Sequence, residues 1–322
     1  MNVLVLGGNG FIGSHIVDAL CATHHTVRIF DRSADPWRPK LDGVRYYTGD
    51  FTNSPMLAEA MQGVEVVVHL ISTTVPSTSN LDPIADIQSN LVSTVQLLQL
   101  MEGAGVRRLV YLSSGGTVYG TPGRIPITED DPLNPICSYG VVKVAIEKYL
   151  TMFEYLYGLK PLILRPSNPY GRRQGHMGVQ GVVATFMHKV IAGEKITIWG
   201  DGSIRRDYVD VSDLARLCCM AIETGATGVF NVGHGTGKTI NEVIEAIERV
   251  TGKKAHTEYL PARRFDVPEV VLDISKAKNA FHWQPEIDFD EGLSRYFTWL
   301  QAQSAVDARW VSEATQSRFR GD

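Results

Sequence analysis

An apolar run that stops at three spaced glycines constrains the fold of this chain more than any other feature. Residues 3–7, VLVLG, predict a buried strand, and residues 11–23, FIGSHIVDALCAT, predict the helix that follows it. Between them, GGNGFIG places Gly7, Gly10 and Gly13 in the turn. Glycine adopts backbone angles that other residues avoid, so the chain can turn tightly and its backbone can approach a ligand closely. This segment therefore predicts the strand, turn and helix of an α/β fold.

The same alternation of apolar runs and helical patterns continues through the first half of the chain. Strands are predicted at 26–32, 64–72, 107–114 and 161–167, and long helices at 85–104 and 138–158. Such alternation is typical of a doubly wound, Rossmann-type parallel sheet with helices on both faces. From about Tyr170 the pattern is more broken and richer in glycine, which predicts a smaller C-terminal α/β domain. We expect a first domain at 1–169 and a second at 170–322, with segments able to cross back between the two.

Composition and charge exclude several classes of partner. The 322 residues carry a formal net charge of −4, so neither nucleic acid nor an anionic membrane surface is expected to bind. The cysteines Cys21, Cys137, Cys218 and Cys219 are too few and too irregularly spaced to predict a disulfide framework or a zinc site. The sequence shows no export leader and no apolar span of membrane-crossing length. We therefore expect a cytoplasmic protein with reduced thiols and no metal.

The glycine turn and an acid after the second strand together predict a dinucleotide cofactor. The backbone N–H groups of Phe11 and Ile12, at the start of the first helix, are suited to a pyrophosphate. Asp31 ends the second strand, where its carboxylate would accept hydrogen bonds from an adenosine ribose. A carboxylate there repels a 2′-phosphate, which favours NAD over NADP. The neighbouring Arg32 could pair with such a phosphate, so NADP stays open.

Tyr139 and Lys143 form the second chemical signature. They are four residues apart in the helix at 138–158 and therefore lie on one helix face, one turn apart. After a dinucleotide turn and a strand ending in SS, the pair resembles the YxxxK signature of the short-chain dehydrogenase/reductase superfamily. The match continues in order through GGNGFIGSH, GDF (49–51), HLIS (69–72), SNLVST (89–94), SSGGTVYG (113–120), SYGVVK (138–143), LRPSNPYG (164–171), RRDYVDVSDLA (205–215) and FNVG (230–233). Over roughly residues 1–300, the chain resembles the extended branch of that superfamily, and within it the nucleotide-sugar epimerases of the UDP-glucose 4-epimerase type.

This resemblance implies further contacts to the cofactor. Asp50 and Phe51 would flank the adenine, and Asn90 would help to hold the central part of the dinucleotide. The residues implied to line the cofactor after the third predicted strand are Leu70, Ile71 and Ser72.

The chemistry of the family requires a base that takes the proton of a sugar hydroxyl while the adjacent C–H leaves as hydride. Free tyrosine has a pKa of about 10, and lowering it toward about 7 requires about 4 kcal/mol. An exposed ion pair contributes at most about 1 kcal/mol, so Lys143 could not achieve this at the surface. A shielded site that holds both the Lys143 ammonium and a positively charged nicotinamide could. We therefore expect Tyr139 to be the base and the bound cofactor to be part of its activation.

The segment SSGGTVYG lacks a hydroxyl where the epimerases usually carry one. Counting back from Tyr119, that position is Gly115, with Ser114 just before it and Thr117 just after the glycine pair. We expect one of these hydroxyls to replace the missing one, with Thr117 preferred to Ser114, because paired glycines can turn either neighbour toward the sugar. The alternative is a water that bridges the sugar to Tyr139. The segment also lacks the Asp-Glu pair of related dehydratases, so a 4,6-dehydratase is not expected.

The resemblance also implies residues for the nucleotide sugar. Arg206 and Arg263 match ligands of the diphosphate, for which the forked donors of arginine are suited. Asn168 matches a contact to the sugar nucleotide, and Asp266 matches a nearby ligand of the nucleotide. The nucleobase would lie along the segment from Thr197 to Trp199.

Two departures from the family pattern bear on the substrate. Gly181 stands where the family usually has an asparagine, which leaves that contact open. Val270 stands where the galactose enzymes can carry a bulky tyrosine that closes the sugar pocket. Valine is smaller, so it predicts room for an N-acetyl group at C2 and activity on UDP-N-acetylglucosamine as well as, or instead of, UDP-glucose.

These implications converge on an NAD-dependent 4-epimerase of a UDP-sugar, either UDP-glucose/UDP-galactose or the N-acetylated pair, that works through a transient 4-keto sugar. Two alternatives share the motifs: a nucleotide-sugar 4-ketoreductase with dissociable NAD(P)H, and a non-catalytic NAD-binding protein, which the glycine at 115 would suit. The family also implies a homodimer formed by the helices at 85–104 and 138–158, whose amphipathic patterns permit this pairing.

Overall fold

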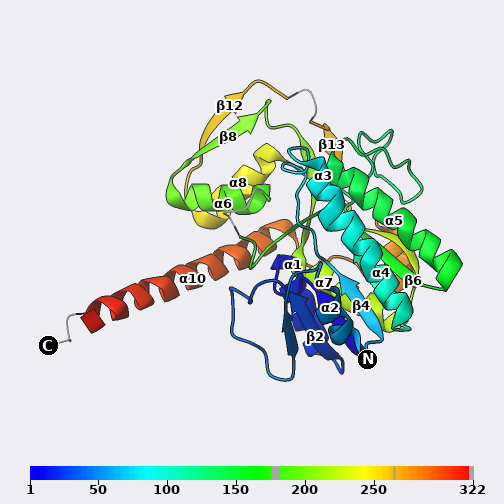
Figure 1. Cartoon of the computed structure of the whole chain (residues 1–322). Helices are drawn as coiled ribbons and strands as arrows, with labels where there is room; N and C mark the ends of the chain where they lie inside the picture. Colours follow the sequence, from blue (N-terminus) through cyan, green and yellow to red (C-terminus); the bar gives the residue numbers. More distant parts are fainter. Residues whose placement is uncertain (176–180, 264–265, 319–322) are drawn as a thin grey trace.

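A parallel sheet with helices packed against it forms one of the two parts of the molecule (Figure 1). The computed structural model describes residues 1–175, 181–263 and 266–318, and within them seven strands pair in the order β10-β6-β5-β4-β1-β2-β3. The strands are β1 (Asn2–Leu6), β2 (Thr26–Asp31), β3 (Arg45–Thr48), β4 (Val66–His69), β5 (Arg108–Leu112), β6 (Lys160–Pro166) and β10 (Gly228–Val232). Each neighbouring pair is parallel. The predicted doubly wound α/β fold is confirmed, and its strand order reverses between β1 and β4, where such folds form a binding crevice.

Helices cover both faces of the sheet because successive residues of its strands are apolar on both sides. Val3 and Val5 of β1 belong to the core on one face, whereas Leu4 and Leu6 belong to the core on the other. On the first face lie α1 (Phe11–Cys21), α7 (Val211–Thr224) and α9 (Ser275–Phe281), and on the second lie α2 (Ser54–Met61), α4 (Ser93–Gly103) and α5 (Ser138–Tyr157). The two cores fix the carboxyl ends of the strands in one row.

Two parts of the first half differ from the sequence prediction. The helix expected at 85–104 consists of α3 (Pro83–Asp86), the π-helical segment η1 (Ile87–Val92) and α4. The strand β3 and the helix α2 were not predicted. The strand left no apolar run in the sequence because it is a short edge strand with no fully buried residue. The π-helical segment widens the helix next to the crevice, a feature that often occurs at functional sites.

The C-terminal half forms a second core beside the sheet. Side chains of α6 (Val182–Ala192), α8 (Ile240–Thr251) and the first turns of α10 (Phe289–Arg318) pack together there. The strands of this part are β7 (Asn168–Tyr170), β8 (Lys195–Trp199), β9 (Arg205–Asp210), β11 (Gly237–Thr239), β12 (His256–Leu260) and β13 (Glu269–Val270). However, β10, α7 and α9 return to the large sheet, so the chain crosses between the two cores more than once. A division at 169/170 remains our proposal for the two domains.

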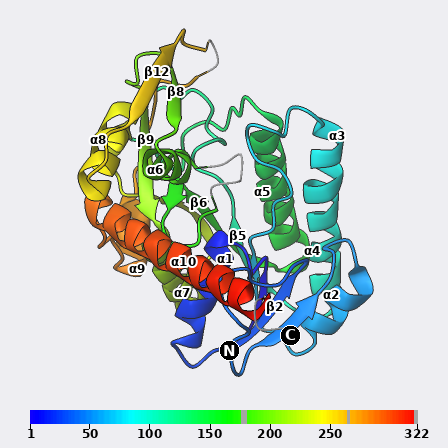
Figure 2. The same ribbon diagram turned by 90° about the vertical axis from the view of Figure 1, so that its left-hand side faces the viewer.

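The arrangement in space places the second core above the crevice. Figure 2 shows β8, β12, α6 and α8 together at one end of the molecule and the large sheet at the other. The helix α10 extends away from both toward the C-terminus (Figure 1). Among the residues that the structure describes, no helix is long and apolar enough to cross a membrane.

Candidate active site

The glycine turn lies at the carboxyl edge of the sheet, between β1 and α1. Gly7 has a φ of 83°, which favours glycine, and a Cβ on Gly13 would overlap the carbonyl oxygen of Gly7. Gly10 is the N-cap of α1, and no described side chain accepts a hydrogen bond there. The N-terminal N–H groups of α1, including those of Phe11 and Ile12, are therefore available to an anion. The glycines thus allow the tight turn that presents these N–H groups, and the turn fits a pyrophosphate.

Asp31 connects this turn to the end of β2. Its Oδ2 accepts a hydrogen bond from the Asn9 N–H at 3.0 Å, and its Oδ1 accepts one from the Ser33 N–H at 3.2 Å. The side chain of Arg32 is exposed. The Asp31 carboxylate is thus fixed at the position where an adenosine ribose would lie beside a pyrophosphate on α1. Its negative charge would repel a 2′-phosphate and is the reason for the predicted preference for NAD over NADP.

The segments after β3 and β4 approach the glycine turn. The Leu70 N–H donates to the carbonyl of Leu6 at 3.1 Å, and the Ile71 side chain lies directly beside Gly7. Ser72 is exposed, and its hydroxyl donates to a carbonyl two residues further along. The structure thus places all three implied cofactor-lining residues at the crevice edge, with Leu70 and Ile71 nearest to the turn.

The two residues implied to flank the adenine differ in burial. Phe51 is buried and packs on the ring of His69, with 5.1 Å between ring centroids. Asp50 is exposed and accepts hydrogen bonds from the backbone and hydroxyl of Thr52, which hold the pKa of its carboxyl below the usual value. Phe51 therefore forms part of the wall near β4, and Asp50 orders the turn in front of it.

Asn90 is held by other protein groups. Its side-chain oxygen accepts from the Thr73 N–H at 2.9 Å, and its amide donates to the Asp86 carboxylate at 2.9 Å. Asn90 is 7% exposed and lies within the π-helical segment. In this structure it orders the loop after β4, and its contact to the cofactor stays a prediction.

Tyr139 and Lys143 lie together at the start of α5, beside the end of β5. The Lys143 ammonium donates to the carbonyl of Leu112 at 2.8 Å. Its Nζ lies 4.8 Å from the ring centroid of Tyr111 and 5.5 Å from that of Tyr139. Lys143 is only 5% exposed, so its positive charge is held inside the protein between two aromatic rings.

Burial changes the acidity of both groups. It lowers the pKa of Lys143 to about 8, although the carboxylates of Glu147 and Asp86 act in the opposite direction. Burial also raises the pKa of Tyr139 to about 12, and a hydrogen bond with Ser114 opposes this increase without overcoming it. At neutral pH the ammonium is charged and the phenol is protonated. Another positive charge is therefore required before Tyr139 can act as a base.

The N-terminus of α5 is fixed by a segment that the sequence analysis did not single out. The Tyr139 N–H donates to the Ser79 hydroxyl at 3.0 Å, and the Ser138 N–H donates to Asn80 at 2.8 Å. The Ser138 hydroxyl donates to the buried Asp86 carboxylate at 2.7 Å. These polar groups replace an N-cap side chain, which α5 lacks at Cys137. The segment with Ser79 and Asn80 has no helix or strand pattern in the sequence, so only its position in the fold shows that it fixes the start of α5.

A buried polar network behind Lys143 was also missed. Glu147 forms a two-pronged ion pair with Arg165, with contacts of 2.6 and 3.0 Å, and accepts the Ser113 hydroxyl at 2.5 Å. Arg165 also donates to the Tyr119 hydroxyl at 2.8 Å. The available signal was the spacing of Glu147, one helical turn after Lys143 on the same face. The network ties α5 to β5 and β6 and keeps a negative charge near the lysine.

The segment with the missing hydroxyl has a definite geometry. A Cβ on Gly115 would lie 2.5 Å from Leu272 Cδ1 and 2.8 Å from the Arg165 carbonyl oxygen, so this position faces the protein interior. A Cβ on Gly116 would meet nothing closer than 3.9 Å and would lie 4.0 Å from the side-chain oxygen of Asn168. The crevice therefore faces position 116, and a hydroxyl at 115 would not fit this backbone.

The two replacement hydroxyls are not equivalent. A side-chain hydrogen bond between Ser114 and the Tyr139 phenol lowers the phenol pKa, against the larger effect of burial. The Thr117 hydroxyl is buried and has no hydrogen-bond partner among the described residues. The contact with the phenol favours Ser114 over Thr117, the reverse of the order that we expected, and the choice between the two hydroxyls stays a prediction.

Residues implied for the nucleotide sugar come together around β9. Arg206 lies in β9 next to β13, and the Asn168 amide donates to the carbonyl of Asp207 from the neighbouring strand β7 at 2.8 Å. Burial lowers the pKa of Arg206, whose guanidinium has an Nη1 contact of 2.8 Å to the carbonyl of Arg205. A partly buried cation is thus placed beside the strand that carries Asn168.

Arg263 and Asp266 form a forked ion pair, with contacts of 2.9 and 3.0 Å. The guanidinium of Arg263 lies 5.6 Å from the ring centroid of Trp199, which is 42% exposed at the end of β8. Thr197 lies two residues earlier on β8 and is half-buried. The structure thus brings Trp199, Arg263 and Asp266 together, although they come from separate segments.

Gly181 and Val270, the two departures from the family pattern, lie in different surroundings. Gly181 has a φ of 94°, and a Cβ there would lie 2.6 Å from the Gln174 side chain, so an asparagine would be strained. Val270 is 2% exposed and belongs to the hydrophobic core with Leu272. Val270 therefore does not face open space in this structure. Its burial does not support the expected room for an N-acetyl group, which stays a prediction.

Together, the strand order, the glycine turn and the tyrosine beside a buried lysine define a dinucleotide-dependent enzyme of the short-chain dehydrogenase/reductase type. The NAD dependent epimerase/dehydratase family matches residues 3–233, and the chain belongs to this family. Its cofactor is accordingly NAD.

Curated and solved relatives agree with this assignment. The UDP-glucose 4-epimerase of Mycolicibacterium smegmatis is 37% identical over 314 residues, which cover 94% of this chain and 100% of that protein. The crystal structure of UDP-glucose 4-epimerase from Thermus thermophilus in complex with NAD is similar with a TM-score of 0.87 and 34% identity, over 94% of this chain and 99% of that one. The UDP-N-acetylglucosamine 4-epimerase of Methanobrevibacter ruminantium, in complex with UDP-N-acetylmuramic acid, gives a TM-score of 0.88 and 29% identity, over 94% and 98% of the two chains.

Proposed function

We propose that this protein is an NAD-dependent 4-epimerase of a UDP-sugar. The observation that carries the proposal is the group formed by Tyr139, Ser114 and the buried Lys143 at the edge of the sheet, beside a turn that fits a pyrophosphate. The named activities of the relatives support the same conclusion. The glycines at 115 and 116 offer no acid for elimination, which separates this site from that of a dehydratase.

The residues divide the chemistry between them. NAD, when bound, accepts the C4 hydrogen of the sugar as hydride and later returns it. Tyr139 takes the proton of the 4-hydroxyl and gives it back after the 4-keto sugar has turned over in the crevice. Ser114 orients the phenol through its hydrogen bond, and Lys143 places a positive charge beside the ring. The sugar leaves with one stereocentre inverted and no net redox change.

The electrostatics of the site explain why the tyrosine acts only in the loaded enzyme. Lowering the pKa of Tyr139 from about 12 to about 7 requires about 7 kcal/mol of preferential stabilisation of the phenolate. Lys143 is one charge available for this purpose, and an oxidised nicotinamide ring would be a second one in the same poorly solvated space. Glu147 helps to keep Lys143 protonated, because its carboxylate raises the pKa of the lysine.

For the substrate, we assign Arg206 and Arg263 to the diphosphate and Trp199 to the nucleobase. Arg206 is partly buried next to Asn168, and Arg263 lies over the Trp199 ring. The Arg263 guanidinium is paired with Asp266, so a diphosphate would have to share or displace that partner. The sugar would then extend toward Gly116, where the crevice leaves room beside Asn168.

A panel of UDP-sugars followed by NMR tests the proposal. We expect the C4 epimer of UDP-glucose or of UDP-N-acetylglucosamine to appear, with cofactor that copurifies at about one per chain and with no net consumption of NADH. A 4-ketoreductase would instead consume NAD(P)H with a 4-keto sugar and form no epimer. A non-catalytic protein would bind NAD and leave every sugar unchanged.

We further propose a homodimer that pairs the helices α3 to α5 of two copies. Exposed apolar side chains lie along these adjacent helices, including Ile84 at 63% on α3 and, near the end of α5, Tyr155 at 88% and Leu156 at 55% exposure. Such a surface costs free energy in water and would be covered by the same surface of a second copy.

A further inference from the structure

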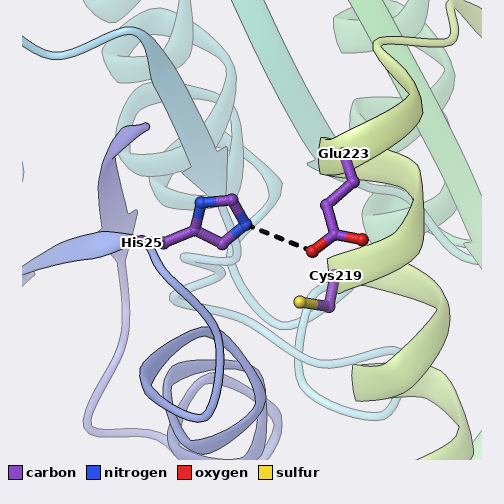
Figure 3. Close-up of side chains that lie close together, drawn as sticks. All are labelled: His25, Cys219 and Glu223. Carbon is purple, nitrogen blue, oxygen red and sulfur yellow. Dashed lines mark ion pairs between the residues drawn. The ribbon is translucent and has the colours of Figure 1, made fainter.

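A second cluster of chemically active side chains lies far from the crevice. Figure 3 shows His25, Cys219 and Glu223 facing one another, with the histidine on the connection before β2 and the other two on α7. Cys219 and Glu223 are four residues apart and therefore share one face of the helix. The donor atoms of all three side chains lie within 4.8 Å of one another.

The contact between the histidine and the glutamate is unlike a hydrogen bond. His25 Nε2 lies 3.6 Å from Glu223 Oε1, beyond hydrogen-bond range, and has no hydrogen-bond partner among the described residues. The other ring nitrogen, Nδ1, lies 3.4 Å from the Met1 amino nitrogen. The His25 side chain is 8% exposed, so Nε2 is a buried polar atom that lies at ion-pair distance from the carboxylate but outside hydrogen-bond range.

The spacing of the donors matches ligands that share one metal ion. Two nitrogen, oxygen or sulfur ligands at tetrahedral angles around zinc, with bonds of about 2.0 to 2.3 Å, lie about 3.3 to 3.6 Å from each other. The 3.6 Å between Nε2 and Oε1 is therefore a suitable separation. Since the donors lie at most 4.8 Å apart, the thiol needs to approach by no more than about 1.5 Å to complete the set, which a rotation of side chains on a helix face allows.

The charges of the cluster also favour a cation. A divalent cation binds the thiolate form of cysteine and displaces its proton, so the Cys219 side chain can contribute a negative charge beside the Glu223 carboxylate. One imidazole nitrogen, one thiolate and one carboxylate are ligands of the kind that zinc and related transition metals bind.

We propose that His25, Cys219 and Glu223 form a binding site for one transition-metal ion of the zinc type. A hollow of about 520 Å³, lined by Cys219, Glu223, Thr23 and Ala19 among others, adjoins two of the three donors. A water molecule from this hollow completes the tetrahedral coordination. The ion fastens the connection between α1 and β2 to α7, two parts that already pack through the α1 and α7 helices.

The site is separate from the proposed epimerase chemistry. His25 immediately precedes the first residue of β2, whereas Asp31 at the cofactor crevice ends the same strand. Glu223 lies near the end of α7, just before β10 begins, so all three donors lie at the amino edge of the sheet. The metal is therefore structural, and its test does not depend on the proposed function.

Metal binding can be measured directly on the full-length, metal-free protein. We expect one equivalent of Zn²⁺ by titration, and with Co²⁺ an intense near-ultraviolet band from thiolate-to-cobalt charge transfer. A hundredfold excess of free Zn²⁺ over its Kd should raise Tm by about 5 °C. Cys219→Ser should remove the charge-transfer band. Glu223→Gln, at a side chain that is 51% exposed, should keep the fold and weaken binding at least about tenfold.

Two neighbouring residues provide matched controls. His24→Ala and Cys21→Ser change an exposed imidazole and an exposed thiol next to the site, and both should bind the ion as the unmodified protein does. Absence of stoichiometric binding to the unmodified protein would overturn the proposal. Binding that survives Cys219→Ser and Glu223→Gln equally, or that is lost with the control changes, would also overturn it. Epimerase activity need not be measured, so failure here and failure of the proposed function are distinct results.

Discussion

Replacing Gly115 by serine restores the hydroxyl that related epimerases carry in this segment, and the structure predicts that it will do harm. The added Cβ would lie 2.5 Å from Leu272 Cδ1, 2.8 Å from the Arg165 carbonyl oxygen and 3.2 Å from that of Pro166. The leucine can move, but the two carbonyls belong to β6, and the Gly115 N–H donates to the Pro166 carbonyl at 2.8 Å. The strand would therefore have to shift to accept the side chain.

The expected cost follows from this overlap. Overpacking of a well-packed interior typically destabilises a protein by 1 to 3 kcal/mol, so about 2 kcal/mol is expected for Gly115→Ser. At about 2 °C per kcal/mol for a chain of this size, Tm should fall by about 4 °C. Turnover should fall as well, because a shift of this segment moves Ser114 away from the Tyr139 phenol.

Gly116→Ser is the matched control. The same side chain is added one residue later, where nothing lies within 3.9 Å of the new Cβ, so Tm should change little. Differential scanning calorimetry and steady-state kinetics on both variants provide the comparison. If Gly115→Ser were as stable as the unmodified protein and turned over faster, the segment would have an open position at 115, and the reasoning from its geometry would be refuted.

Four further results are expected. Tyr139→Phe should lower kcat at least about 10³-fold while NAD binds normally in a fluorescence titration, since only the proton acceptor is lost; near-normal turnover would remove the tyrosine from the mechanism. Ser114→Ala should lower kcat more than Thr117→Val, because only Ser114 contacts the phenol; equal, small effects would indicate that neither hydroxyl is used. Lys143 has a pKa of about 8 when folded against 10.5 as the ordinary value, so the unfolded chain binds more protons between these pH values. Raising the pH through this window should therefore stabilise the unmodified protein relative to Lys143→Met by about 3 kcal/mol in urea titrations, and parallel pH profiles would contradict this. Analytical ultracentrifugation should show the proposed dimer for the unmodified protein and monomers for Tyr155→Asp, and an equal mass for the two would contradict this pairing.

Most of the sheet could be predicted from the sequence because its strands are buried on both faces. Val3 to Leu6 form a continuous apolar run for this reason, and each similar run became a strand. By contrast, β3 is an edge strand of mixed polarity and left no such pattern. The helix at 85–104 was predicted as regular, but periodicity does not distinguish a π-helical segment from the α-helix on either side of it.

Only part of the candidate site could be predicted from the sequence. The glycine turn and the Tyr139–Lys143 pair are local patterns, and local geometry follows from residue spacing alone. The preference for Thr117 over Ser114 rested on the flexibility of two glycines. The contact of Ser114 with the Tyr139 phenol favours the other order, and the sequence could not show that contact because it joins a loop after β5 to a separate helix.

The sequence by itself determined the alternating α/β fold, the dinucleotide turn and the tyrosine and lysine on one helix face, since each depends on residues within one or two turns of chain. Only the tertiary structure decided which distant groups share a buried environment. The pairing of Glu147 with Arg165 behind Lys143, and the meeting of His25 with Cys219 and Glu223, both join segments far apart in the chain. Their charges affect one another because folding removes the water between them, and no spacing along the chain encodes that proximity.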